Sequence, residues 1–137
     1  MATVTAPRRA AKPQIRQTQL LIDGQWTPAR SGKTFETINP STEEVIAQVA
    51  EADAADVELA VLAARKAFDE GPWPRMNARE RGKIMMRLAD LIESEIDELA
   101  ALESLDNGKP VSDARLGDIP IALDVIRYYA GWDDNMQ

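Results

Sequence analysis

The stretch that decides the fold is LAALESLDNGKPVSDARLGDIPIALDVIRYYAGW, residues 99–132. Asn107-Gly108 is a typical helix end, because glycine tolerates the left-handed backbone conformation that stops a helix. Pro110 suits the first turn of a following helix, where its missing N–H leaves no bond unmade. We predict that the last helix starts near Asp118, with Pro120 inside its first turn.

The helix predicted at the end of this stretch is apolar on almost every side. Between Ile119 and Trp132 the only charged residues are Asp124 and Arg127. Its two apolar faces are Ile119, Ala122, Leu123 and Ile126, and Ile121, Val125, Tyr128 and Trp132. Such a helix must be buried on most sides. A few short strands and three amphipathic helices cannot cover it, so we expect further sequence to do so.

Length and composition narrow the classes of function. The chain has 137 residues, enough for one domain, with a net charge of −7 and a pI near 4.6. This acidity argues against a nucleic-acid-binding surface. Because there is no cysteine and no histidine, the chain holds no thiol nucleophile, no histidine acid–base pair and no zinc site. No apolar run approaches the roughly 18 residues of a membrane helix, and we expect no membrane partner.

Residues 1–19 contain no acid, and prolines interrupt their four basic residues, Arg8, Arg9, Lys12 and Arg16. One interpretation is a disordered N-terminal extension of a cytoplasmic protein. The other is a presequence for the mitochondrial matrix, which is also Arg-rich and acid-free. We predict the extension, since the prolines would break a presequence helix.

Residues 20–50 have the pattern of short strands. Asp23-Gly24, between the apolar runs 20–22 and 25–27, predicts a hairpin with a type I′ turn. Residues 34–38 and 45–49 are two further β-prone runs, on either side of a turn. Isolated hairpins are marginal in water, so these strands need a sheet or helices to lie on.

From residue 53 the apolar period changes from two to 3.6 residues. Asp53 with Asp56 predicts a capping box, and the first helix then has an apolar face on Val57, Ala60, Val61, Ala64 and Phe68. Asn77 predicts the start of a second helix, with an apolar stripe on Ile84, Met85, Leu88, Leu91 and Ile92. Ser94 is a candidate cap for a third. The chain is therefore expected to be α/β, with short strands followed by about four helices.

Three polar features are candidates for chemistry. Gly108-Lys109 follows a helix rather than a strand, so we interpret it as a helix end with a solvated lysine, not a phosphate loop. Asp106 either ties down its turn through backbone N–H groups or binds a hard cation through its carboxylate. The third is an acidic cluster, interpreted as a solvated face rather than a cation or acid–base site, at Glu93, Glu95, Asp97 and Glu98.

Six segments together resemble the N-terminal part of NAD(P)-dependent aldehyde dehydrogenases. Their order and spacing agree from about residue 20 to residue 132, and residues 1–19 fall outside the resemblance. The segments are LIDGQW (21–26), INPSTEEVI (38–46), AARKAF (63–68), RLADLIE (87–93), LDNGKP (105–110) and RYYAGW (127–132).

The resemblance implies a longer enzyme with a Rossmann-like cofactor domain, a catalytic domain and an oligomerising arm, assembled as a homodimer or homotetramer. Residues 20–137 would be the N-terminal portion of the cofactor-binding domain. The family oxidises an aldehyde to a carboxylic acid: a cysteine thiolate attacks the carbonyl, hydride passes to NAD+ or NADP+, and a glutamate activates the water that hydrolyses the thioester. These catalytic residues and cofactor contacts would lie beyond Gln137, so we expect this chain to be structural and inactive alone.

Two sets of site residues also follow from the resemblance. Some family members bind a structural monovalent or divalent cation, which implies the carbonyl of Ile38 and the carboxylate of Asp106 as ligands. The last helix resembles one that lines the aldehyde tunnel, which makes Asp118 and Ile121 candidates for its mouth and wall. The alternative for Ile121 is plain core. The competing hypothesis for the whole chain is a stand-alone, non-catalytic helical module that binds a partner through this last helix.

Overall fold

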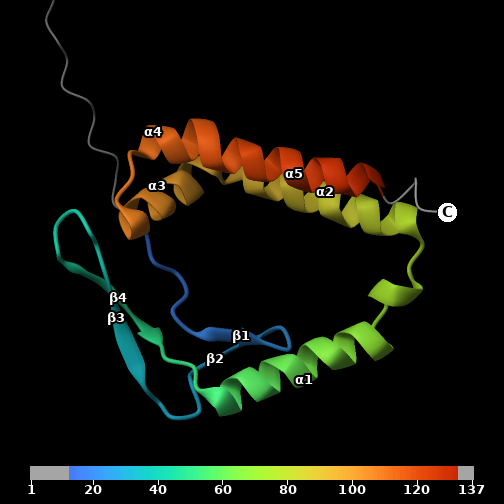
Figure 1. Cartoon of the computed structure of the whole chain (residues 1–137), viewed down its shortest axis with the longest axis horizontal. Coiled ribbons are helices and arrows are strands. Elements are labelled where there is room, and N and C mark those ends of the chain that lie inside the picture. The colour runs from blue at the N-terminus through green and yellow to red at the C-terminus, as the bar shows by residue number, and fades with distance from the viewer. Residues whose placement is uncertain (1–12, 133–137) are drawn as a thin grey trace, which may run out of the picture.

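The computed structural model describes residues 13–132, which form short strands followed by helices (Figure 1). The strands are β1 (Leu20–Ile22), β2 (Gln25–Thr27), β3 (Thr34–Ile38) and β4 (Val45–Ala50). The helices are α1 (Ala54–Glu70), α2 (Ala78–Ser94), α3 (Ile96–Asn107), α4 (Val111–Asp113) and α5 (Ile119–Trp132), with a 3₁₀ turn at Trp73–Arg75 and a π turn at Ala114–Asp118. Within residues 13–132, every helix is too short or too polar to cross a membrane.

The strands pair as two separate antiparallel hairpins. β1 pairs with β2, and the turn between them has positive φ at Asp23 (50°) and Gly24 (73°), as a type I′ turn requires. β3 pairs with β4, with a shift in register between Thr37 and Ile38. The hairpin predicted at residues 20–27 and the two strands predicted at residues 34–38 and 45–49 are thus confirmed. Neither sheet extends beyond two strands in the part of the chain described.

Residues 13–19 of the predicted extension contact this fold. The backbone N–H of Ala50 in β4 donates to the carbonyl of Thr18, at 2.8 Å. Arg16 forms an ion pair with Glu98 of α3, at 3.0 Å. Residues 1–12, which carry most of the basic residues of the proposed extension or presequence, lie outside the described part.

The predicted capping box at the start of α1 is confirmed. The Asp53 carboxylate accepts from the N–H of Ala55 at 2.9 Å, and the Asp56 carboxylate accepts from the N–H of Asp53 at 3.0 Å. Asp56 also accepts from the N–H of Arg30, at 3.0 Å, and is only 2% exposed. These two amides, that of Asp53 first, hold the pKa of the Asp56 carboxyl below its ordinary value. Asp56 therefore ties the loop before β3 to α1.

Small residues make the contact between α2 and α5, which run antiparallel (Figure 1). Gly82 and Ala89 are the buried residues of α2, and Ile119, Leu123 and Ala130 are the buried residues of α5. The small residues Gly82, Ala89 and Ala130 let the two backbones approach closely. The predicted stripe is therefore only in part the packed face of α2: Ile92 packs against the core and Met85 is half-buried, whereas Ile84, Leu88 and Leu91 remain exposed.

One predicted helix start is wrong: Ser94 ends α2, where its hydroxyl donates to the carbonyl of Leu91, and Glu95 instead precedes α3. The predicted start of the last helix near Asp118 is confirmed, since α5 begins at Ile119 with Pro120 in its first turn. The helical turns α4 and the π turn lead into it from Val111 without a break. Pro120 has no N–H to donate and its ring would press on the carbonyl four residues back. The wider π turn ends just before it and accommodates it.

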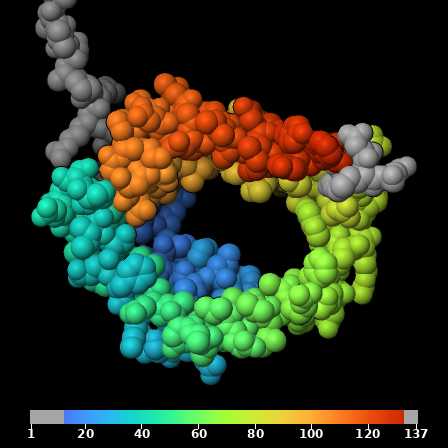
Figure 2. Space-filling view, viewed as in Figure 1, coloured from blue at the N-terminus to red at the C-terminus, as the bar shows by residue number. Residues whose placement is uncertain are grey.

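Large apolar side chains stay exposed on three helices. They include Val57, Val61 and Phe68 on α1, Ile84, Leu88 and Leu91 on α2, and Ile121, Val125 and Tyr128 on α5. The space-filling view shows an open gap between α1 and the α2–α5 pair (Figure 2). Full burial of each such side chain would contribute about 1.5–3 kcal/mol. A further layer of structure packed on these faces would therefore stabilise the fold.

We expect the isolated chain of residues 1–137 to self-associate or to stay partly molten at neutral pH, since so much apolar surface is exposed. Size-exclusion chromatography with light scattering, together with amide NMR spectra, measures this. A monomer with sharp, dispersed amide signals would contradict the expectation.

Candidate functional site

The junction of the fold is the loop of residues 106–110, which follows α3. Gly108 has φ of 80°, the left-handed conformation predicted for this helix end, and its N–H donates to the carbonyl of Ser104. The Lys109 N–H donates to Asn107 Oδ1 at 2.9 Å, and the Ser104 hydroxyl donates to the Lys109 carbonyl at 2.6 Å. The loop backbone is thus fixed by side chains of its own helix.

The same loop contacts the β3–β4 hairpin. The Thr37 hydroxyl donates to Asp106 Oδ1 at 3.3 Å. A Cβ on Gly108 would lie 2.9 Å from Pro40 Cγ and 3.3 Å from Ser41 Oγ, so the turn between β3 and β4 rests directly on this glycine. Only glycine fits both the left-handed backbone and this close approach.

On its other side the loop binds the start of α5. Lys109 Nζ forms an ion pair with Glu103 Oε1 at 3.1 Å and with Asp118 of the π turn. The Asp118 carboxylate, and after it that of Glu103, raises the pKa of the Lys109 ammonium. The predicted helix end is confirmed, since α3 stops at Asn107. The Lys109 side chain keeps 31% of its surface exposed, and it also links α3 to the π turn through its two ion pairs.

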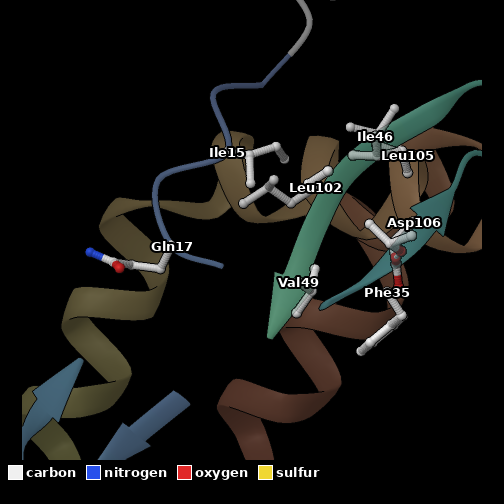
Figure 3. Close-up of a pocket in the computed structure, with 10 residues that line it drawn as sticks. Ile15, Gln17, Phe35, Ile46, Val49, Leu102, Leu105 and Asp106 are labelled. Atoms are coloured by element: carbon white, nitrogen blue, oxygen red, sulfur yellow. Dashed lines mark hydrogen bonds between the residues drawn. The ribbon is translucent and has the colours of Figure 1, made fainter. Parts of the chain in front are cut away.

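A cavity of about 520 Å³ lies between residues 15–17, the β3–β4 hairpin and α3 (Figure 3). Its wall is mainly apolar, with Phe35, Val49 and Leu102 among the lining side chains. Among residues 13–132, Asp106 is the only charged residue that lines it, and it lies at the loop just described. These residues therefore supply no acid–base pair to the cavity.

The structure brings the two predicted cation ligands near each other. Asp106 accepts from Thr37, and Ile38 follows Thr37 at the end of β3. Within residues 13–132 no group of three acidic, cysteine or histidine side chains could hold a metal ion. Because Ca²⁺ takes six to eight oxygen ligands, Asp106 and the Ile38 carbonyl would be part of a larger set.

The two predicted tunnel residues share one face of the helix. Asp118 starts a row that continues through Ile121, Val125, Tyr128 and Trp132, spaced as neighbours on a helix are. Ile121 is 64% exposed, so it is not core among the described residues. The Tyr128 ring lies 5.7 Å from that of Trp132, centroid to centroid. The row is an exposed apolar surface with a carboxylate at one end.

The acidic cluster forms an exposed face, as predicted for Glu93 and Asp97, and three of its carboxylates also form ion pairs. Glu93 pairs with Arg127 at 2.6 Å, Asp97 with Arg115 at 2.5 Å and Glu98 with Arg16 at 3.0 Å. The hydrogen bond that Arg127 donates to the Glu93 carboxylate, and after it the one to Asp90, raises the pKa of the Arg127 guanidinium. The cluster thus joins α2 and α3 to other segments, although exposed ion pairs of this kind stabilise a fold only slightly.

The comparisons with known proteins agree on one family. Residues 26–137 match the aldehyde dehydrogenase family. The chain is 54% identical over 123 residues to aldehyde dehydrogenase family 2 member B4, mitochondrial, of Arabidopsis thaliana, over 90% of this chain and 23% of the plant protein. It is 52% identical over 134 residues to the mitochondrial aldehyde dehydrogenase of Homo sapiens, over 97% of this chain and 26% of the human protein.

Solved structures give the same result. The NAD+ complex of an aldehyde dehydrogenase from Bacillus cereus has a TM-score of 0.85 at 43% identity, over 93% of this chain and 28% of that one. An indole-3-acetaldehyde dehydrogenase in its apo form has a TM-score of 0.86 at 40% identity, over 90% and 28%. The chain belongs to the aldehyde dehydrogenase family, as its sequence motifs indicated. It spans about a quarter of the length of the curated relatives it matches.

We expect Gly108→Ala to destabilise the fold by more than Gly24→Ala does. Both positions have positive φ, which costs a residue with a Cβ about 1–2 kcal/mol. Only at Gly108 would the new Cβ also press on Pro40, since nothing lies within 4 Å of a Cβ at Gly24. Denaturant unfolding of the whole protein that carries this chain measures both. Equal losses would show that the contact with Pro40 does not constrain the loop.

Proposed function

We propose that the whole protein oxidises an aldehyde to a carboxylic acid with NAD+ or NADP+, in a homodimer or homotetramer. The observation that carries the proposal is the family match over residues 26–137, together with the similarity to a Bacillus cereus aldehyde dehydrogenase in complex with NAD+. The chemistry would use a cysteine thiolate and a glutamate, as the resemblance implies. The 137 residues contain no cysteine, so the nucleophile has to come from elsewhere in such a protein.

The part played by this chain in that enzyme is structural. Its exposed apolar faces on α1, α2 and α5 fit a layer that packs against the remaining three quarters of the family's length. The described residues offer no glycine-rich loop between a strand and a helix, which is the usual cradle for a dinucleotide phosphate. We therefore assign no NAD(P) contact to residues 13–132 and expect the chain alone to be inactive.

Within this enzyme we propose that the face of α5 that begins at Asp118 lines the aldehyde tunnel. Asp118 would stand at the mouth and Ile121 in the wall. Two features support this: the row is apolar and exposed, as a tunnel wall needs before the rest of the fold covers it, and it carries a single carboxylate at one end.

We also propose that a structural cation binds at Asp106 and the carbonyl of Ile38. The contact between Thr37 and Asp106 supports this, because it holds the carboxylate beside the end of β3. Carboxylate and carbonyl oxygens are the ligands that hard cations prefer. Further ligands would come from outside residues 13–132.

We expect the size of residue 121 to set which aldehydes the whole protein accepts. In Ile121→Trp the ratio of kcat/KM for benzaldehyde to that for acetaldehyde should fall about tenfold, and in Ile121→Ala it should rise, because a pocket discriminates by the volume it leaves. Steady-state rates of NADH or NADPH formation measure this ratio.

The matched control is Val61→Ala, on the exposed face of α1, which should leave the ratio unchanged. If both Ile121 variants keep the wild-type ratio, α5 does not line the tunnel. A wild-type protein that oxidises no aldehyde would refute the proposed activity itself.

We expect Asp106→Ala to abolish stabilisation by small cations. Thermal unfolding of the whole protein would be measured in Na+, K+ or Mg²⁺ and, at equal ionic strength, in tetramethylammonium. The wild type should melt at a higher temperature in one of the small cations, and Asp106→Ala should melt at the same temperature in all. Asp124→Ala, an exposed carboxylate on α5, is the control. If Asp106→Ala keeps the wild-type cation response, Asp106 is a turn residue only.

A further inference from the structure

Every polar group of Lys109 has a partner within the fold. Its N–H donates to Asn107 Oδ1 and its carbonyl accepts from the Ser104 hydroxyl, both on the helix end before it. Its ammonium lies between Glu103, at 3.1 Å, and Asp118. Glu103 is itself held, since Asn107 Nδ2 donates to the same carboxylate oxygen at 2.6 Å. A side chain with four rotatable bonds is therefore held in one place.

The partner of this lysine stands at a special point of α5. Asp118 is the last residue of the π turn, in which the Ile119 N–H bonds to the carbonyl of Ala114, five residues back. Single π turns inside α-helices are frequent at functional sites. From Asp118 the exposed row of Ile121, Val125, Tyr128 and Trp132 begins, and Asp118 is its only group charged at neutral pH.

Lys109 is the only cation paired with Asp118 in the described part of the chain. Without it the carboxylate, which is 49% exposed, would be free to turn toward the apolar row and would carry its full negative charge there. The ion pair therefore fixes both the direction and the effective charge of the one ionised group on this face.

We propose that Lys109 is a positioning residue that sets aldehyde specificity by holding and partly neutralising Asp118 at the tunnel mouth. The inference rests on the proposed function, in which the row on α5 lines the tunnel. Lys109 does not touch the aldehyde. It acts through Asp118, and its effect therefore depends on the charge that the aldehyde carries.

The net charge of Lys109, Glu103 and Asp118, here called the charge cluster, predicts the order in which the variants should prefer an anionic aldehyde. One ammonium and two carboxylates leave the wild type at −1. The cluster becomes −2 in K109M and 0 in D118N, and it returns to −1 in the double variant K109M/D118N. The ratio of kcat/KM for an anionic aldehyde to that for a neutral one should therefore be highest in D118N, equal in wild type and double variant, and lowest in K109M.

The experiment uses the whole protein with three aldehydes of different charge: succinic semialdehyde, butanal and betaine aldehyde. We expect the anionic-to-neutral ratio to fall about fivefold in K109M and to rise about fivefold in D118N, the effect of one unit charge at several ångström in a partly solvated site. The cationic-to-neutral ratio should change in the opposite direction. The change should lie mainly in KM rather than kcat.

K109R, which keeps the charge, and K83M, which removes a lysine with no ion pair among the described residues, should both resemble the wild type. An equal loss for all three aldehydes in K109M, not reversed in the double variant, would show that Lys109 only stabilises the turn.

D118N tests the same idea without removing the lysine, because Lys109 still pairs with Glu103. If D118N folds and its anionic-to-neutral ratio of kcat/KM equals that of the wild type, the proposal is also wrong. A wild type without aldehyde oxidation refutes the proposed function as well, whereas a wild type that is active but shows no charge order in the variants refutes only this inference.

Discussion

The left-handed turn at Gly108 is the constraint on which the arrangement of this chain depends. It stops α3 and brings three neighbouring residues to three different partners. Asp106 meets Thr37 of β3, Gly108 lies under Pro40, and Lys109 reaches Asp118. A side chain at position 108 would disturb all of them, because the conformation and the contact with Pro40 both exclude a Cβ. One short loop thereby holds the second hairpin, the end of α3 and the start of α5 in a fixed relation.

Among the described residues, small side chains fill the core and many large apolar side chains are exposed, which is the reverse of the usual arrangement. Its most deeply buried members are Ala89, Ala100 and Ala114, and no large side chain there is fully buried. In a self-sufficient domain the large aliphatic and aromatic residues fill the interior. Here they are exposed on faces that the chain does not cover, while alanines let the helices pack against each other. This is the pattern expected of one layer of a larger core, and it agrees with a chain that spans about a quarter of its relatives' length.

Signals set by neighbouring residues were predictable from the sequence. The capping residues Asp53 and Asn77, the turn at Asp23-Gly24 and the stop at Gly108 all depend on local backbone geometry, and the structure confirms them. Periodicity alone could not choose the packed face of α2, since that helix is apolar on one side and lined with small residues on another.

The long-range contacts were not predictable for a related reason. Lys109 and Asp118 are nine residues apart across a loop, and the arginines that bind the acidic cluster lie 18 to 82 residues from their partners. The proposed site residues Ile38, Asp106, Asp118 and Ile121 came from the family resemblance. The structure shows their places, namely the Thr37–Asp106 contact and the shared face of α5, and these would not follow from spacing.

The π turn also bears on how the length of this region can vary during evolution. The Ile119 N–H bonds five residues back, to the carbonyl of Ala114, so the turn holds one residue more than an α-turn would. That residue is taken up within one wider turn. Deletion of a single residue between Ala114 and Asp118 would therefore restore a regular helix and leave the segments on either side of it in nearly the same orientation. Relatives one residue shorter at this point should keep both the loop at Gly108 and the exposed row on α5 in place.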